Sequence, residues 1–219
     1  DIKSLKREEL CREMEALGEK KFRADQLYQW MHKKLAGSLE EMTNLSQELR
    51  RRLGEQYEYV CLETVEVQRS QMDGTCKYLF RLPDGHVIES VLMRYRHGNT
   101  VCISSQAGCR MGCRFCASAI GGLVRSLRPS EMLEQIYRIQ KDIGERISNV
   151  VVMGTGEPLD NYDNLLTFLG LLSDENGLHI SQRSITVSTC GIAPRIRSLA
   201  EEELSITLAL SLHAPTQEK

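Results

Sequence analysis

Three cysteines crowd into one short segment of the chain. Cys109, Cys113 and Cys116 follow one another with the spacing C-x3-C-x2-C, while the other five cysteines are scattered. Iron–sulfur clusters are held by cysteine thiolates, and a cubane contains four irons. Three cysteines therefore leave one iron without a protein ligand, where a small molecule can chelate it. The spacing predicts a catalytic [4Fe–4S] cluster.

Zinc is the main alternative for these cysteines. Structural zinc sites usually combine two C-x2-C pairs and close four ligands around the ion. Only Cys113 and Cys116 have this spacing, and the second pair is missing. Cys102 or Cys190 could complete a site, yet neither has a partner at the required spacing. The pattern therefore favours the iron–sulfur cluster.

The cysteines lie in a basic segment of a slightly acidic chain. The 219 residues carry a net charge of −2, but residues 86–130 hold six arginines and one acidic residue. This segment would attract a polyanion, and its arginines could equally stabilise the negative charge of a cluster. No apolar run is long enough to span a bilayer, and the first residues lack the apolar core of a secretory signal. We expect a cytoplasmic protein with no membrane partner.

Apolar periodicity divides the chain into three parts. Residues 1–56 repeat apolar side chains at helical spacing, and residues 57–97 alternate in steps of two with turn signals between, as in a β meander. Residues 98–219 alternate strands with helices, which predicts an α/β fold with a parallel sheet or barrel. The expected strands here are 100–104, 148–154, 184–189 and 205–211, and the expected helices are 129–146, 161–172 and 194–202.

The cysteine motif and the alternation after it resemble the radical S-adenosylmethionine (SAM) superfamily. In that superfamily the methionine part of SAM chelates the open iron, and an electron from the cluster cleaves the sulfonium to a radical. Phe115, beside the last cysteine, matches the aromatic residue usual there. The segment 154–158, GTGEP, resembles the element that holds the methionine amino group. Gly156 and Glu157 are therefore candidate cofactor-binding residues, and a carboxylate suits an ammonium group.

Longer stretches resemble the RlmN/Cfr family of RNA adenine methyltransferases. They are FRADQLYQW, ESVLMRYRHGNTVCISSQAGCRMGCRFCAS, VVMGTGEPLDNYDN, SITVSTCG and LALSLHAP, and they cover most of the chain. The resemblance implies a helical accessory RNA-binding domain at 1–56, a β-hairpin extension at 57–97, and at 98–219 the first four strands of a partial (β/α) barrel. An RlmN-type enzyme would methylate C2 of an adenine in 23S rRNA, with tRNA as a further candidate substrate. A Cfr-type enzyme, which methylates C8, is the alternative.

The resemblance also assigns individual residues. Glu89 matches a proton acceptor, and its strand position predicts a partly buried carboxylate with a raised pKa, although a salt-bridged strand residue is the plainer reading. Cys102 matches a cysteine that forms a transient disulfide with a methyl-carrying cysteine, and its plainer reading is a small buried residue. Four residues at strand ends match cofactor contacts: Ser188, Ser211, Leu212 and His213. The remaining cysteines, Cys190 included, are read as structural.

The methyl-carrying cysteine of the family has no counterpart in these 219 residues. We therefore expect the full protein to continue beyond Lys219, and this chain alone to be inactive on RNA. The implied chemistry also needs a low-potential electron donor, such as a flavodoxin or a ferredoxin. A monomer is expected.

Two other functions would use the same cysteines: a radical activase acting on a protein partner, and a zinc-stabilised RNA-binding module. The helical front and the basic segment favour RNA over the activase. We expect anaerobic purification to yield a brown protein that contains iron and sulfide. A colourless protein with stoichiometric zinc would instead support the zinc module.

Overall fold

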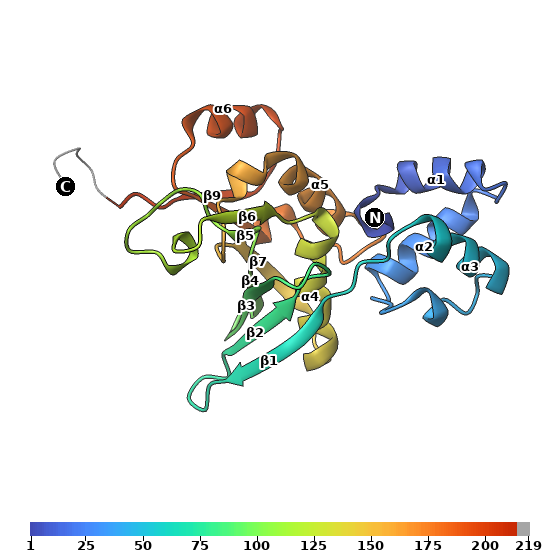
Figure 1. Ribbon diagram of the computed structural model, residues 1–219, viewed down its shortest axis with the longest axis horizontal. Coiled ribbons are helices and arrows are strands. Elements are labelled where there is room, and N and C mark those ends of the chain that lie inside the picture. The colour runs from blue at the N-terminus through green and yellow to red at the C-terminus, as the bar shows by residue number, and fades with distance from the viewer. Residues whose placement is uncertain (214–219) are drawn as a thin grey trace.

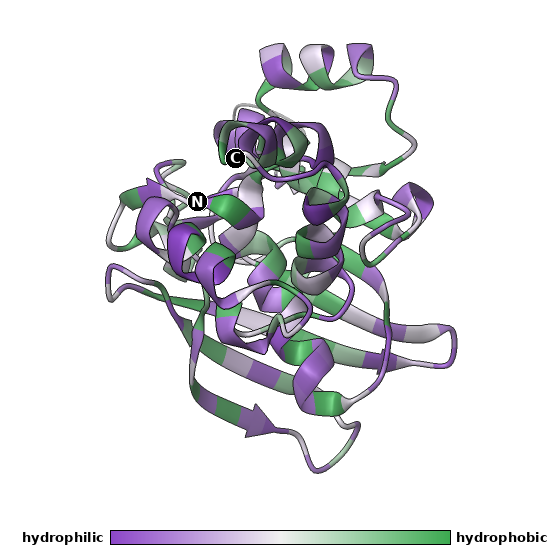
Figure 2. Ribbon diagram, turned by 90° about the vertical axis from the view of Figure 1, so that its right-hand side faces the viewer, coloured by the Kyte–Doolittle hydropathy of each residue, from purple (hydrophilic) through white to green (hydrophobic). Residues whose placement is uncertain are grey.

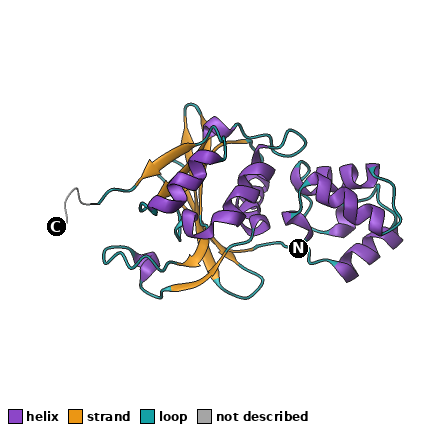
Figure 3. Cartoon of the chain, turned by 90° about the horizontal axis from the view of Figure 1, so that it is seen from above, coloured by secondary structure: helices purple, strands orange, loops and turns teal. Residues whose placement is uncertain are grey.

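The computed structural model describes residues 1–213, in which a helical N-terminal part lies beside a larger α/β part (Figure 1). Seen from above, the N-terminal helices gather at one side of the strands and their covering helices (Figure 3). Ala214 and Pro215, which end the LALSLHAP stretch, lie outside the described residues. No helix among residues 1–213 combines the length and apolar character needed to cross a membrane.

Three α-helices build the N-terminal part: α1 (Arg7–Ala16), α2 (Phe22–His32) and α3 (Gln47–Gln56). The hydroxyl of Ser46 caps α3 by accepting a hydrogen bond from the backbone N–H of Leu49. The three helices bury one apolar face each in a shared core, with Leu10, Leu27 and Leu53 fully buried. The expected helical character of residues 1–56 is confirmed, while the division into domains stays a prediction.

Seven strands form one continuous sheet in the order β1-β2-β3-β4-β7-β8-β9. The first pairs are antiparallel and join β1 (Glu63–Arg69), β2 (Cys76–Arg81), β3 (Val87–Tyr95) and β4 (Gly98–Ile103). The pairs from β4 onward are parallel and add β7 (Ile147–Val152), β8 (Ile185–Thr189) and β9 (Thr207–Leu210). The α/β class and the four parallel strands are confirmed. The meander extends the same sheet, because β3 pairs directly with β4.

One face of this sheet is covered by helices. α4 (Pro129–Ile143) and α5 (Tyr162–Ser173) pack on it, and α6 (Ala193–Glu201) follows β8. Strand residues on this face, such as Val101, Val150 and Val187, are fully buried. Cys102 and Val151 point to the other face and are only partly buried. The antiparallel strands carry both hydrophobic and hydrophilic residues along their length (Figure 2).

A small hairpin that the periodicity does not predict frames the three clustered cysteines. Its strands are β5 (Gln106–Gly108) and β6 (Leu123–Ser126), which pair antiparallel. A Cβ atom at Gly108, whose φ is +77°, would lie 2.0 Å from the carbonyl oxygen of Gly122. Only glycine allows this close approach. The hairpin therefore fixes both ends of the cysteine-bearing loop.

A buried ion pair fastens the first residues to α4. The Lys3 side chain is fully buried, and its Nζ lies 2.7 Å from Glu134 Oε1 and 2.7 Å from the carbonyl oxygen of Val60. The same ammonium stands 4.0 Å from the centre of the Tyr59 ring. Glu134 also accepts a hydrogen bond from Arg138 Nε at 3.0 Å. This network joins the N-terminal part to the α/β part.

Replacing Lys3 by methionine tests this network. The variant leaves the buried Glu134 carboxylate with Arg138 as its remaining cation, so we expect the free energy of unfolding to fall by about 3 kcal/mol. Urea denaturation followed by circular dichroism measures it. Lys33→Met, at an exposed position, is the control and should change stability by less than about 0.5 kcal/mol. Equal effects of the two substitutions would contradict the role of Lys3.

Candidate functional site

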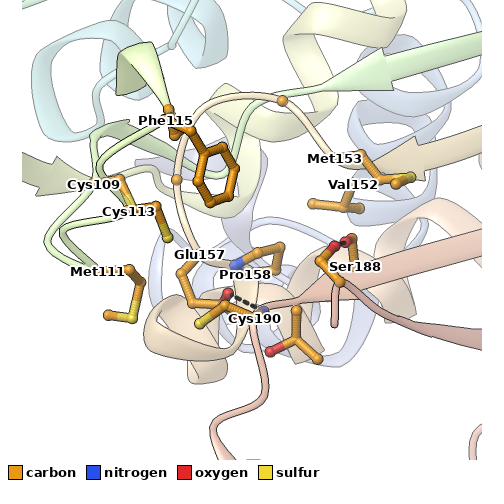
Figure 4. A pocket seen from close by; sticks show the side chains of 15 residues that line it. Cys109, Met111, Cys113, Phe115, Val152, Met153, Glu157, Pro158, Ser188 and Cys190 are labelled. Atoms are coloured by element: carbon orange, nitrogen blue, oxygen red, sulfur yellow. Dashed lines mark hydrogen bonds between the residues drawn. The ribbon is translucent and has the colours of Figure 1, made fainter. Parts of the chain in front are cut away.

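A cavity of about 180 Å³ opens at the carboxyl ends of β7 and β8, next to the cysteine-bearing loop (Figure 4). Four segments line it: the loop 109–116, the turn 152–158, the end of β8 at 188–190, and Ser211 after β9. Carboxyl ends of parallel strands are where α/β proteins bind their ligands. The cavity is therefore the candidate site.

Most of the residues expected to act together meet in this cavity. Those that line it are Cys109, Cys113, Cys116, Gly156, Glu157, Ser188 and Ser211. His213 lies beside it and stacks on Phe115, with 4.3 Å between ring centres. Leu212, in contrast, is 67% exposed and does not line the cavity. Their roles as ligands stay predictions.

The loop that carries the three cysteines is shaped by its own backbone. The N–H of Cys109 donates to the carbonyl of Gly122 at 3.0 Å, and that of Cys116 donates to Cys113 at 3.1 Å. Burial, together with the neighbouring thiols of Cys113 and Cys116, raises the pKa of the Cys109 thiol. A raised pKa opposes loss of the thiol proton. A bound metal reverses this effect, because it stabilises the thiolates that ligate it.

The donor set fits an iron–sulfur cluster better than a single ion. Within residues 1–213, no three His, Cys, Asp or Glu side chains are arranged around one point as a lone metal ion would need. In a cubane each cysteine binds its own iron, so the three cysteines that line this cavity could each supply one thiolate to a cluster.

The Glu157 carboxylate is held rigidly at the cavity wall. The side chain is buried, with 4% of the residue exposed. Its Oε1 accepts from the backbone N–H of Leu159 at 3.1 Å, and its Oε2 accepts from that of Cys190 at 2.8 Å (Figure 4). The two oxygens carry four lone pairs, so the carboxylate keeps acceptor capacity beyond these two bonds and the hydrogen bond with the Cys190 thiol. The carboxylate can thus receive an ammonium group that enters the cavity.

Glycine is required in the turn before Glu157. Gly156 has a φ of +105°, and a Cβ there would lie 2.5 Å from the Cβ of Gln106. At Gly154 a Cβ would lie 2.8 Å from the carbonyl oxygen of Ile103. The two glycines let the turn lie directly on the chain that leads into the cysteine loop.

Two hydroxyl groups close the far wall of the cavity. Ser188 Oγ at the end of β8 lies 2.9 Å from Ser211 Oγ after β9. Parallel pairing of β8 and β9 brings these positions together, since Ser188 is in register with Ala209. The pair can exchange its mutual hydrogen bond for bonds to a ligand's hydroxyl or carboxylate groups.

The expected partial burial of Glu89 is wrong. Its side chain is 54% exposed and forms an ion pair with Lys77 at 3.3 Å, as the plainer reading had it. Glu89 points to the face of β3 that α4 and α5 leave uncovered, whereas its neighbours Ile88 and Ser90 are buried. The sequence alternation could not tell which face the helices cover.

Cys102 is partly buried on the open face of the sheet, where burial raises the pKa of its thiol. All eight cysteines are free, so the structure does not support a disulfide.

Cys190 is misplaced by the sequence reading. It was expected in the core, but it is exposed and lines the cavity beside the three clustered cysteines. Although the residue is exposed, partial burial of its thiol and the hydrogen bond to Glu157 raise the pKa of Cys190 to about 12. Cys190 directly follows the last residue of the parallel strand β8. This position indicates the site, because ligands bind at the carboxyl ends of parallel strands.

Known proteins resemble the chain along its whole length. Residues 1–58 match the family described as ribosomal RNA large subunit methyltransferase N-terminal domain, and residues 103–219 match the radical SAM superfamily. A probable dual-specificity RNA methyltransferase RlmN from Lachnospira eligens is 69% identical, and its counterpart from Lachnoclostridium phytofermentans is 62% identical. Both alignments cover 100% of the chain and 62% of the relative. The chain therefore spans less than two thirds of these relatives.

A solved structure agrees with the fold. The crystal structure of a radical SAM methyltransferase from Sphaerobacter thermophilus superposes with a TM-score of 0.92 at 39% sequence identity. The match covers 99% of this chain and 64% of the other.

Gly156→Ala should distort the turn at the cavity. The added methyl group would overlap Gln106, and alanine is strained at the φ of +105° that this turn adopts, so we expect a loss of about 2 kcal/mol in the free energy of unfolding. Gly121→Ala is the matched control, because a Cβ there meets nothing within 4 Å. Chemical denaturation of both variants measures the difference, and equal stabilities would show that the turn tolerates a side chain.

Proposed function

Because the chain belongs to the radical SAM superfamily and its first residues match the N-terminal domain of large-subunit rRNA methyltransferases, we propose that it is the cluster- and cofactor-binding part of an RlmN-type RNA methyltransferase. Superfamily membership implies a [4Fe–4S] cluster and SAM. The observation that carries the proposal is the single cavity lined by three cysteines and a buried, backbone-held carboxylate.

The chain's own residues divide the binding tasks. Cys109, Cys113 and Cys116 would ligate the cluster, and Glu157 would accept hydrogen bonds from the cofactor's ammonium group. When bound, the cluster and SAM supply an electron and a carbon radical, chemistry that protein side chains lack. Gly156 brings the turn's backbone close to the ligand.

Other residues near the cavity would hold the remaining parts of SAM. The Ser188 and Ser211 hydroxyls suit a ribose or a carboxylate, and the stacked Phe115 and His213 rings offer a flat apolar surface near the adenine end. Leu212 follows Ser211 directly, and we assign it to the cofactor side although its exposed side chain does not line the cavity.

Glu89 and Cys102 face the open side of the sheet, and we assign them to the substrate side of the reaction. Glu89 would accept a proton from the methylated adenine, and its exposure leaves the carboxylate accessible. Cys102 would resolve the covalent adduct together with a cysteine in the part of the relatives that this chain does not span.

The substrate we propose is an adenine of 23S rRNA, methylated at C2 through a methyl-cysteine intermediate. The chain's relatives are described as dual-specificity RNA methyltransferases, which supports a second RNA substrate, and for this we propose tRNA. The basic segment 86–130 supplies attraction for RNA. The electron would come from a flavodoxin or ferredoxin, and the protein would act as a monomer.

Methylation assays test this proposal. The chain alone, given rRNA, SAM and a reductant, should give no methyladenosine. The chain joined to the part of a relative that it does not span should give 2-methyladenosine. Mass spectrometry of the digested RNA distinguishes the products. A Cys113→Ala version of the joined protein is the inactive control. An 8-methyladenosine product would favour the Cfr-type alternative, and no product from the joined protein would contradict the proposal.

A further inference from the structure

A buried glutamine links the cysteine loop to the turn that carries Glu157. Gln106 is fully buried in β5, three residues before Cys109. Its Oε1 accepts from the backbone N–H of Glu157 at 2.9 Å, and its Nε2 donates to Asp160 Oδ2 at 2.9 Å. The Gln106 side chain thus connects β5, which leads into the cysteine loop, with the turn that carries Glu157.

Asp160 extends this link into the cysteine loop itself. The same Oδ2 accepts a second hydrogen bond, at 2.8 Å, from Nε of Arg110, the residue after Cys109. Burial alone raises the pKa of Asp160, but the hydrogen bonds from Gln106 and Arg110 outweigh it and keep that pKa below its usual value. Asp160 is therefore a charged acceptor that holds two donors at one oxygen.

No second hydrogen bond within residues 1–213 joins the cysteine loop to the segment around Asp160, apart from the one that Arg110 donates. Within the described residues, the backbone hydrogen bonds of the stretch 109–119 stay inside that stretch or run to Ile120 and Gly122 of the same hairpin. Among side chains of this stretch, Arg110 alone makes a hydrogen bond to another part of residues 1–213, and its acceptor is Asp160. The position of the loop against the rest of the cavity therefore depends on this contact, beyond the hairpin and the stacking of Phe115.

We infer that Asp160 is a positioning residue, which sets the cysteine loop at a fixed place relative to the Glu157 turn. The inference rests on the proposed function and adds to it the group that aligns the cluster ligands with the cofactor-binding carboxylate. Asp160 would touch neither the cluster nor SAM. It acts through Arg110 and Gln106, as outer residues orient the ligands of many metal sites.

A merely structural ion pair would behave differently. The Arg110 side chain is 59% exposed, and exposed ion pairs add little to global stability. Arg110→Ala should therefore leave the melting temperature close to that of the wild type. Asp160→Ala should lower it, because Asp160 is only 17% exposed and its loss also removes an acceptor of the buried Gln106 amide. In both variants, loss of the contact should change how firmly the loop holds iron and how tightly SAM binds.

Two substitutions, Asp160→Ala and Arg110→Ala, test the inference in the anaerobically reconstituted 219-residue chain. The readouts are the rate of iron loss to a chelator and the SAM dissociation constant, followed by the electron paramagnetic resonance spectrum of the reduced cluster. We expect Asp160→Ala to lose iron about tenfold faster and to bind SAM about tenfold more weakly, with a smaller change for Arg110→Ala. Asp160→Asn, which keeps an acceptor oxygen, should recover part of the loss.

Asp163→Ala is the matched control, since this nearby carboxylate is exposed and makes no side-chain hydrogen bond or ion pair within residues 1–213. It should behave as the wild type. Wild-type iron retention and SAM affinity in Asp160→Ala would overturn the inference. If Asp160→Ala does not fold, the same measurements on Arg110→Ala, at an exposed position, test the inference. Wild-type iron retention and SAM affinity in Arg110→Ala would then overturn it. A wild-type chain that takes up no cluster would overturn the proposed function together with this inference.

Discussion

The candidate site depends on the parallel pairing of β4 with β7 continuing past the ends of both strands. After Ile103 and Val152 the two chains stay in contact, because the N–H of Gly154 donates to Ile103 and those of Ser105 and Gln106 both donate to Thr155. This contact places the start of the cysteine loop against the turn that carries Glu157. Side chains at residue 154 or 156 would separate them, so the glycines are part of the same constraint.

Buried amides make this irregular contact possible inside the protein. Backbone groups beyond the strand ends lose their sheet partners, and an unpaired buried group costs about 1–3 kcal/mol. Gln135 of α4 donates to the carbonyl of Ser104 and accepts from its N–H, while Asn161 donates to the carbonyls of Ser105 and Leu127. The helices that cover the sheet therefore also satisfy the backbone beneath the site.

Sequence patterns predict features that are set by residues close together in the chain. They fail where packing between distant segments determines the structure. The cysteine spacing and the alternation of strands and helices are local, and the structure agrees with the elements they predict. The β5–β6 hairpin escapes prediction because its strands have only three and four residues and no apolar alternation. The full burial of Lys3 also escapes, since a charged residue near the start of a chain is expected at the surface and becomes buried here only through Glu134.

The exposure of Glu89 and the cavity position of Cys190 follow from the same division of the sheet. One face carries Val101, Val150 and Val187 under α4 and α5, and its burial stabilises the fold. The other face and the carboxyl edge carry the polar and thiol groups, which cannot act on a ligand if helices cover them. A sheet stabilised from one side alone leaves its second side accessible. Glu89 on the uncovered face and Cys190 at the carboxyl edge are therefore both groups whose environment depends on where the helices pack, which the local sequence pattern does not contain.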